Sequence, residues 1–222
     1  KRYSKKVHWW GCQFNNGRLK FKISKKGFKK TNISAVGGPC LAAGLASKIR
    51  SSVVLANSDT NTTRSIGKMI STNYYSTEFS NDLVGVEVCA AIKNIYSMII
   101  GASKGLCSSK ATEEIKDKNY LNTAASLMYH SISEMHYFTK ALKGKEETVY
   151  GLAGLGDLYV SSAGGRNALM GSFLGEGLTF SEAKKSKMKE ITVEGADLIK
   201  EIGKKVKEDF DDKKLPLMIA MI

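Results

Sequence analysis

The chain has 222 residues and a formal net charge of +13, from 34 basic and 21 acidic side chains. This length allows one large domain or two small ones with a buried core, and the composition is that of a soluble globular protein. Nearly all of the excess positive charge is lysine, whereas nucleic-acid-binding surfaces usually cluster arginine between aromatic residues. The charge therefore indicates solvated lysine-rich surfaces, and we expect no nucleic acid as a partner.

The cysteines and histidines show no spacing typical of a redox motif or a metal site. We expect reduced, buried thiols in a cytoplasmic protein and no bound metal. No apolar run approaches the length of a membrane span, and the basic first residues do not lead into an apolar signal core. The sequence thus predicts no transmembrane segment. The cysteines are Cys12, Cys40, Cys89 and Cys107, and the histidines are His8, His130 and His136.

The first part of the chain alternates short apolar runs with turn residues, which is typical of an α/β arrangement. The turn signal Asn15-Asn16-Gly17 predicts two short strands on either side of it. A third strand ends in the glycine turn at Gly37-Gly38, and a fourth is an apolar run that reads as buried. The expected strands cover residues 7–14, 19–23, 32–36 and 52–57, with a helix or tight loop at 41–49 and a helix at 60–69.

From residue 81 onward the pattern changes to long helices, which we expect at residues 83–102, 119–142 and 193–210. The second of these helices carries an apolar stripe that predicts a core-facing side. We therefore place a domain boundary near residue 80, with an α/β domain at 1–80 and a mainly helical domain at 81–222. The stripe consists of Met128, Ile132, Met135, Phe138 and Leu142.

Lys93 lies in the middle of the apolar helix expected at residues 83–102. An ammonium group in such a helix loses hydration unless a partner compensates it, and a desolvated lysine can exchange a proton near neutral pH. The alternative is a lysine at the edge of a core helix whose ammonium reaches solvent. Lys93 is the first candidate for chemistry in this chain.

A loop between the second and third expected helices holds the glycine-rich segment 151–158, followed by Gly164-Gly165-Arg166-Asn167. Glycines let the backbone approach a ligand and direct N–H groups at it. An arginine beside an amide suits bidentate capture of a phosphate, which a lysine cannot provide. The alternative is a glycine-rich turn that carries a surface arginine.

Several motifs occur together in the order and approximate spacing of one enzyme family. They are Gly38-Pro39, the GVEVCAAIKN sequence at 85–94, GLAGLGDL at 151–158, Arg166-Asn167 and Val193-Glu194-Gly195. Together they resemble NAD(P)-dependent glycerol-3-phosphate dehydrogenase over residues 34–217. The resemblance implies a Rossmann-type α/β portion followed by a mainly α-helical C-terminal substrate domain of the 6-phosphogluconate-dehydrogenase-like kind. It also implies interconversion of sn-glycerol 3-phosphate and dihydroxyacetone phosphate with NAD or NADP, supplying glycerol phosphate for lipid synthesis.

The resemblance also implies roles for individual residues. Lys93 would be the general acid/base, and Asn94 and Asp157 would join its polar network and contact the substrate. Arg166 and Asn167 would bind the substrate phosphate, with Arg166 also near the cofactor. The remaining cofactor-binding residues would be Gly38, Cys40, Ala42, Thr192 and Glu194, where Cys40 replaces a serine that is usual in the family. The partner would be a small phosphorylated substrate, with a homodimer left open.

Two departures from the family pattern stand out. The segment 158–165 is shorter than expected, and Gly165 stands where the family commonly has serine, so substrate choice could differ. No Gly-x-Gly-x-x-Gly follows an expected strand, so the first half of a Rossmann domain is not seen and we expect a fragment of a longer chain. Two alternatives remain: a related two-domain dehydrogenase for another small hydroxy compound, or a non-catalytic remnant that binds phosphate or polyanions.

Overall fold

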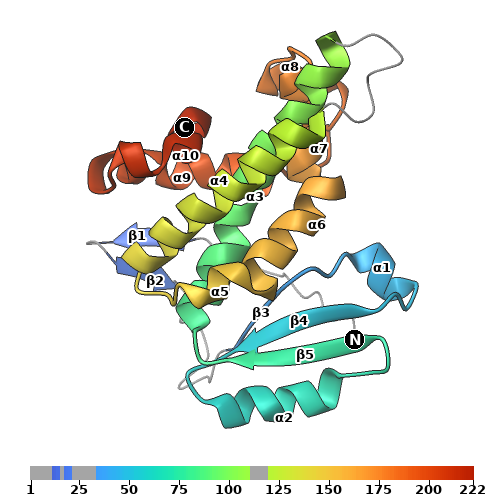
Figure 1. The fold of residues 1–222 in the computed structure, drawn as a ribbon, viewed down its shortest axis with the longest axis vertical. Helices are drawn as coiled ribbons and strands as arrows, with labels where there is room; N and C mark the ends of the chain where they lie inside the picture. The colour runs from blue at the N-terminus through green and yellow to red at the C-terminus, as the bar shows by residue number, and fades with distance from the viewer. Residues whose placement is uncertain (1–11, 16–17, 22–33, 111–119) are drawn as a thin grey trace, which may run out of the picture.

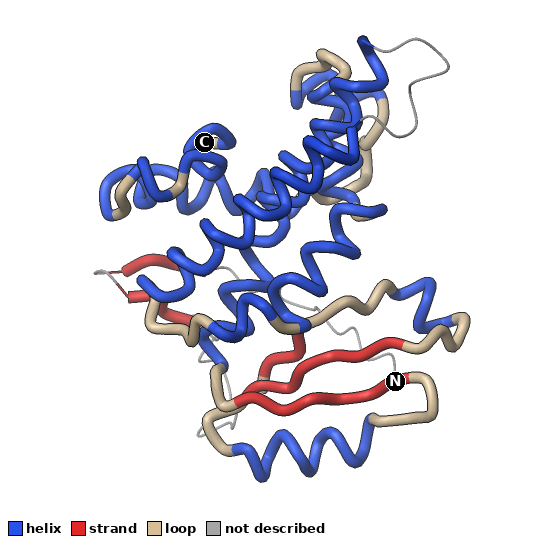
Figure 2. The backbone as a smooth tube through the Cα atoms, in the orientation of Figure 1, coloured by secondary structure: helices blue, strands red, loops and turns tan. Residues whose placement is uncertain are grey.

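The computed structural model describes residues 12–15, 18–21, 34–110 and 120–222. Its largest part is helical and is built around the long helices α3 (Leu83–Lys110) and α4 (Tyr120–Ala141), which pack against each other. A small α/β part lies at one end of these helices (Figure 1). Figure 2 shows a sheet with helices beside it in this small part, and a separate pair of strands beside the helices of the larger part.

The sheet of the α/β part has three strands in the order β3 (Ala35–Gly37), β4 (Ser51–Ala56) and β5 (Tyr75–Ser80). Strand β3 runs antiparallel to β4, whereas β4 and β5 are parallel and are joined by helix α2 (Thr60–Ile70). The side chain of Asp59 caps α2 by accepting the Asn61 N–H at 3.0 Å. The strand expected at 52–57 and the helix expected at 60–69 are confirmed.

Strand β5 was not expected from the sequence. Its residues, Tyr-Ser-Thr-Glu-Phe-Ser, include no continuous apolar run, because β5 is an edge strand whose side chains are exposed or half-buried. The position of β5 is nevertheless fixed by its pairing with the buried strand β4, in a register that puts Ser51 opposite Tyr75. A complete doubly wound sheet is not found among the described residues, so the α/β prediction is confirmed only for this three-stranded part.

The turn signal near the start of the chain is flanked by an antiparallel pair, β1 (Cys12–Asn15) and β2 (Arg18–Phe21). This confirms the two short strands, although both are shorter than expected. Residues 7–11, 22–23 and 32–33 of the expected strands lie outside the described residues. The helix or tight loop expected at 41–49 is the short helix α1 (Ala42–Ala46).

The segment between α4 and α9 (Glu194–Asp209) is helical, so the expectation of a loop there is wrong. Glycines allow α3 and α7 (Arg166–Gly175) to lie in close contact: a Cβ on Gly101 of α3 would lie 2.1 Å from the Ala168 carbonyl oxygen, and one on Gly171 would lie 1.8 Å from that of Met98. The segment comprises α5 (Glu147–Tyr150), the π-helical turn η1 (Leu152–Gly156), α6 (Asp157–Gly164), α7 (Arg166–Gly175) and α8 (Phe180–Ser186).

Helix α3 is the centre of the helical part and contacts α4, α6, α7 and α9. Its residues Leu83–Ser108 are long and apolar enough to cross a membrane by length and composition. The expectation that no apolar run has this length is therefore wrong. More than half of this apolar stretch is buried inside the protein. Its apolar character is therefore explained by packing, as in the core helix of a globular domain.

The apolar stripe expected on α4 is confirmed, with Ile132, Met135 and Phe138 buried in the main core. Glu134 on the same helix is also buried, and its carboxylate accepts the backbone N–H groups of Leu217 at 2.6 Å and Met218 at 2.9 Å. These residues belong to α10 (Pro216–Met221), which follows the short 3-10 turn η2 (Asp212–Lys214). Glu134 thus ties the end of the chain to the core.

The cysteine prediction is partly wrong. Cys40, Cys89 and Cys107 are free thiols, but only Cys89 is buried, while Cys40 and Cys107 are half-buried. Burial raises the pKa of the Cys89 thiol to about 12, which keeps it protonated and unreactive. The side chain of Cys12 lies outside the described residues.

Asp82 lies at the boundary between the α/β part and the helical part, just before α3. It is 5% exposed, and its carboxylate accepts the Gly85 N–H at 2.9 Å at the start of α3. The same carboxylate accepts the Lys145 N–H at 2.8 Å and the Thr148 hydroxyl at 2.6 Å. One side chain therefore fixes both the beginning of α3 and the segment that leads into α5.

We expect Asp82→Ala to lower the free energy of unfolding by about 3 kcal/mol, because it leaves buried donors without their charged acceptor. Denaturant unfolding followed by circular dichroism measures this change. Glu147→Ala is the matched control, since it removes an exposed carboxylate from α5, and we expect a change below about 0.5 kcal/mol. Equal stabilities of the two variants would contradict the role of Asp82.

Candidate active site

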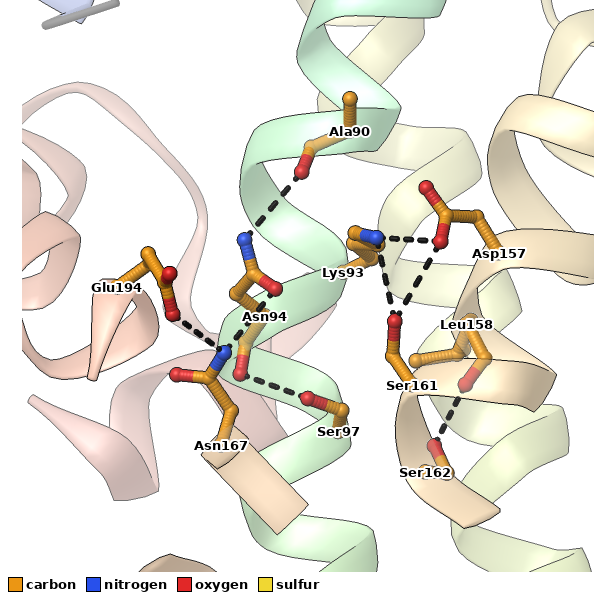
Figure 3. Close-up of polar contacts among 10 residues, drawn as sticks. All are labelled: Ala90, Lys93, Asn94, Ser97, Asp157, Leu158, Ser161, Ser162, Asn167 and Glu194. Carbon is orange, nitrogen blue, oxygen red and sulfur yellow. Dashed lines mark hydrogen bonds and ion pairs between the residues drawn. The ribbon is translucent and has the colours of Figure 1, made fainter. Parts of the chain in front are cut away.

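Two adjacent residues of α3, Lys93 and Asn94, belong to two different polar clusters on neighbouring faces of the helix. Successive residues of an α-helix point roughly 100° apart, so the two side chains meet different partners. Lys93 faces α6, whereas Asn94 faces α7 and the start of α9 (Figure 3). The candidate site therefore has two halves that share one helix turn.

The first cluster consists of Lys93, Asp157 and Ser161. The Lys93 ammonium pairs with Asp157 Oδ1 and donates to Ser161 Oγ at 3.1 Å, and Ser161 Oγ lies 3.4 Å from Asp157 Oδ1. The Lys93 side chain is only 16% exposed and that of Asp157 10%. Lys93 is therefore desolvated and compensated by a partner, whereas the alternative of an ammonium that reaches solvent does not fit.

Asp157 owes its position to the turn that precedes it. The π-helical turn η1 ends at Gly156, so Asp157 is the first residue of α6 and points back at α3. Burial raises the pKa of the Asp157 carboxyl, while Lys93, the Gly38 N–H and Ser161 act in the opposite direction. Burial has the largest effect, so the pKa of the Asp157 carboxyl is raised overall, and shifted carboxyl groups of this kind are common at functional sites.

The second cluster joins α3, α7 and α9 through Asn167. Its amide nitrogen donates to Asn94 Oδ1 at 3.1 Å and to Glu194 Oε2 at 3.2 Å, and its amide oxygen accepts the Gly195 N–H at 2.8 Å. Arg166 pairs with the other oxygen of Glu194. Because the Arg166 side chain remains 53% exposed, its other donors are accessible to an anion.

The remaining predicted residues lie around these clusters. Gly38 reaches the first cluster through its backbone N–H, whereas Cys40, Ala42 and Thr192 make no described hydrogen bond or ion pair with either cluster. Ala42 and Thr192 are exposed. The structure thus brings together Lys93 with Asp157, and Arg166 with Asn167 and Glu194.

Ser161 was missed by the sequence reasoning. It lies four residues after Asp157, which places both side chains on one face of α6 once that segment is known to be helical. The structure also explains why residue 165 is a glycine, since a Cβ there would lie 2.4 Å from the Ser161 carbonyl oxygen. A serine at this position would require α6 or α7 to move.

Glu87 is a buried carboxyl of α3 outside both clusters. Its Oε2 atom has no hydrogen-bond partner, and burial raises the pKa of Glu87 to about 7. In the unfolded chain the group ionises near 4.5, so ionisation costs folding free energy as pH rises from that value through 7. This loss of folding free energy is absent below both pKa values, where the carboxyl is protonated in the folded and the unfolded chain. It is complete above about pH 8, where the carboxyl is ionised in both.

We therefore expect Glu87→Gln to stabilise the protein at pH 8 by on the order of 1 kcal/mol, a value reduced for the partial exposure of the side chain. At about pH 4, below both pKa values, the gain should nearly vanish. Urea unfolding at the two pH values measures the difference, with the exposed Glu201→Gln as control. A gain that is the same at both pH values would contradict this account.

No group of three or more His, Cys, Asp or Glu side chains in the described part of the chain is arranged to hold a metal ion. What the two clusters can do is proton exchange at Lys93 beside an anion site at Arg166. A glycine turn, at Gly38, lies against the first cluster. Its φ of 130° is one that residues with a side chain rarely adopt, and a Cβ there would lie 3.1 Å from the Val53 Cα.

Comparison with known proteins gives a consistent result. The family model described as NAD-dependent glycerol-3-phosphate dehydrogenase C-terminus matches residues 82–222. The NADP(+)-dependent glycerol-3-phosphate dehydrogenase of Archaeoglobus fulgidus is 34% identical over 149 residues, which cover 67% of this chain and 43% of that protein. The glycerol-3-phosphate dehydrogenase (NAD(P)+) of Clostridium tetani is 30% identical over 175 residues, covering 78% and 47%.

The solved structures agree with these relatives. The crystal structure of glycerol-3-phosphate dehydrogenase from Coxiella burnetii superposes with a TM-score of 0.72 at 27% identity, over 85% of this chain and 54% of that one. The Plasmodium falciparum enzyme superposes with a TM-score of 0.78 at 20% identity, over 96% and 58%, and is similar in fold. The chain spans about half the length of the curated relatives it matches.

Proposed function

The chain belongs to the NAD-dependent glycerol-3-phosphate dehydrogenase family through its C-terminal domain, and we propose that the protein interconverts sn-glycerol 3-phosphate and dihydroxyacetone phosphate with NAD or NADP. The observation that carries the proposal is the pairing of the buried Lys93 with Asp157 beside the exposed Arg166. A proton donor on α3 thus lies near an anion site at the start of α7, since Asn94, the neighbour of Lys93, accepts a hydrogen bond from Asn167.

Two domains would divide the work. Residues 1–80 would belong to a Rossmann-type dinucleotide-binding domain, and residues 81–222 would form the helical substrate domain. The change from strands to helices supports this division, because β5 ends at Ser80 and α3 begins at Leu83. The parallel β4-α2-β5 unit is a common component of dinucleotide-binding sheets.

Lys93 would act as the general acid/base. In the reductive direction its ammonium would donate a proton to the C2 oxygen of dihydroxyacetone phosphate, and in the oxidative direction the amine would take it back. Asp157 and Ser161 hold the ammonium in place, which orients its remaining donor capacity toward the substrate. The low exposure of Lys93 keeps competing water away from the proton.

Arg166 and Asn167 would bind the phosphate of the substrate. The planar guanidinium group of Arg166 can donate two hydrogen bonds to one phosphate, and the exposure of the side chain leaves N–H donors accessible for this. In the described state Glu194 accepts hydrogen bonds from both residues, so it orders the pair before a ligand arrives. Asn94, which accepts from Asn167, would contact the substrate on the side nearest Lys93.

The nicotinamide cofactor would supply the hydride exchanged with C2. Gly38, Cys40, Ala42, Arg166, Thr192 and Glu194 would hold the part of it nearest the substrate. The residues here are accessible to that reacting end, because Ala42, Thr192 and the side chain of Arg166 are exposed. The glycine fingerprint for a pyrophosphate is not present in this sequence, so that contact is not assigned to these residues.

The setting of the reaction follows from the chemistry. The protein would be cytoplasmic, would take a small phosphorylated substrate and would supply glycerol phosphate for lipid synthesis, with a homodimer as the assembly to test. A related dehydrogenase for another small hydroxy compound is the second candidate. It is favoured by Gly165, where α6 passes into α7 without space for the serine usual in the family.

Nicotinamide absorbance tests both candidates. The intact protein is mixed with dihydroxyacetone phosphate and, separately, NADH or NADPH. Rapid oxidation that depends on this substrate supports the proposal and identifies the preferred cofactor. No oxidation by a folded protein would refute it, and activity with another hydroxy or keto compound in a substrate panel would favour the second candidate.

A further inference from the structure

The turn at residues 37–39, between β3 and α1, lies directly against the π-helical turn η1. A Cβ on Gly37 would lie 3.1 Å from the Ala153 Cβ, and a Cβ on Gly38 would lie 3.4 Å from the Leu152 Cβ. On the other side, a Cβ on Gly156 would lie 3.3 Å from the Cδ of Pro39. The two turns are therefore packed along their length, and η1 leads straight into Asp157.

Gly38 also acts on Asp157 itself, because its backbone N–H lowers the pKa of the Asp157 carboxyl. The orientation of this N–H depends on a φ of 130°, which residues with a side chain rarely adopt. A Cβ there would lie 3.1 Å from the Val53 Cα, so β4 fixes the turn from behind. A continuous path of contacts thus runs from β4 through Gly38 to Asp157, and from Asp157 to Lys93.

Resting on the function proposed above, we propose that the turn at residues 37–39 is a positioning element for Lys93. Its Gly38 N–H fixes the Asp157 carboxylate, so the α/β part of the chain sets the orientation of the reacting lysine. The turn, which lies between β3 and α1 in Figure 1, would therefore act on proton transfer as well as on the cofactor. A small displacement of β3 relative to α6 would change the rate of the chemical step without removing any group that reacts.

Gly156→Ala tests this idea without disturbing the local backbone. Gly156 has helical angles, φ −61° and ψ −47°, which alanine adopts easily, and its new Cβ would press on Pro39. We expect kcat to fall about 10-fold, because the turn and its N–H are pushed away from Asp157. The acidic limb of the kcat profile should move up by about 1 pH unit, because the carboxylate loses a donor to its charged form.

The KM for the nicotinamide cofactor should stay within about twofold, since the substitution changes none of the residues proposed to hold the cofactor. Gly44→Ala, a glycine-to-alanine change in α1 with only ordinary contacts, is the matched control and should leave both kcat and its pH profile unchanged. A raised cofactor KM with an unshifted pH profile would mean that the turn serves the cofactor alone, and it would overturn the proposal.

Gly38→Ala is the second variant, with Gly177→Ala as its control for backbone strain. Both glycines have positive φ, but a Cβ at Gly177 meets open space. Acylation of Lys93 by an amine-reactive reagent, followed by peptide mass spectrometry, gives a readout that does not need turnover. We expect acylation to rise several-fold in Gly156→Ala and Gly38→Ala, because the ammonium is less firmly held.

The two readouts separate failure of this inference from failure of the proposed function. If the unmodified protein shows no dehydrogenase activity, the function fails while the acylation still reports on the turn. If the protein is active and both variants keep the original acylation rate and pH profile, the inference is wrong. A rise in acylation confined to the two variants, absent from both controls, supports it.

Discussion

Replacing Lys93 by alanine is expected to lower kcat by about 10⁴-fold, the largest effect of any single change in this site. The reason is that Lys93 is the proposed group that exchanges a proton with the substrate, and no other lysine contacts Asp157 in the described part of the chain. Steady-state rates of nicotinamide oxidation measure the loss. KM values should change little, since Arg166 and Asn167 still bind the substrate.

The fold should survive the change. Removing one member of a buried ion pair usually destabilises a protein, because it leaves a charge without compensation. Here burial already raises the pKa of the Asp157 carboxyl, so it can take up a proton once Lys93 is gone. Circular dichroism should therefore be unchanged. Lys104→Ala, an exposed lysine of the same helix, is the control and should retain full activity.

Near-normal turnover of Lys93→Ala would refute the role of this lysine. A large loss of activity together with loss of the helical signal would be uninformative about chemistry, so Lys93→Arg provides a second comparison. Arginine keeps the charge and can still pair with Asp157, but it does not deprotonate under these conditions. A folded, inactive Lys93→Arg variant would show that the exchangeable proton, rather than the charge, is what the site needs.

The sequence predicts that Lys93 is desolvated and compensated by a partner, because this signal is local. An ammonium in the middle of a long apolar helix has to be compensated, and the structure supplies Asp157 for that purpose. The strand β4 and the helix α2 are also predicted well, since their patterns lie within a single element. Local patterns are enough where one element carries the whole signal.

The parts that the sequence does not predict depend on contacts between distant segments. The strand β5 has polar residues and is placed only by pairing with β4, 24 residues earlier in the chain. The glycines of segment 151–158 read as part of a loop, whereas this segment is helical, and Gly171 of α7 allows that helix to pack closely on α3. Ser161 joins the site only because its segment is helical, which the mistaken loop assignment concealed.

Glu194 shows a further limit of sequence reasoning. The family resemblance places it near the cofactor, but the structure places its carboxylate between Arg166 and Asn167. These partners lie 28 and 27 residues earlier in the chain, so no spacing pattern predicts the contact. Arg166 is therefore ordered by a neighbour from another helix before it meets any phosphate.

Arg166→Ala is expected to lower kcat/KM for dihydroxyacetone phosphate by roughly 10³-fold, the second largest effect. Arg166 is the only arginine in the described residues of the helical part, and more than half of its side chain is exposed toward a ligand. Without it, the phosphate loses a bidentate charged contact, and Glu194 adds an uncompensated negative charge to the site. Most of the loss should appear in KM if the contact is equally strong in the ground state and the transition state.

Inorganic phosphate distinguishes a phosphate contact from a general loss of structure. It should inhibit the unmodified protein competitively against dihydroxyacetone phosphate, and Arg166→Ala should weaken this inhibition in parallel with the rise in KM. Arg64→Ala is the control, because Arg64 lies over the ring of Phe79 in the α/β part. Unchanged phosphate inhibition in Arg166→Ala would show that the anion binds at a site other than Arg166. A partial recovery of activity by added guanidinium would show that the missing group is the positive fork itself, acting directly on the substrate.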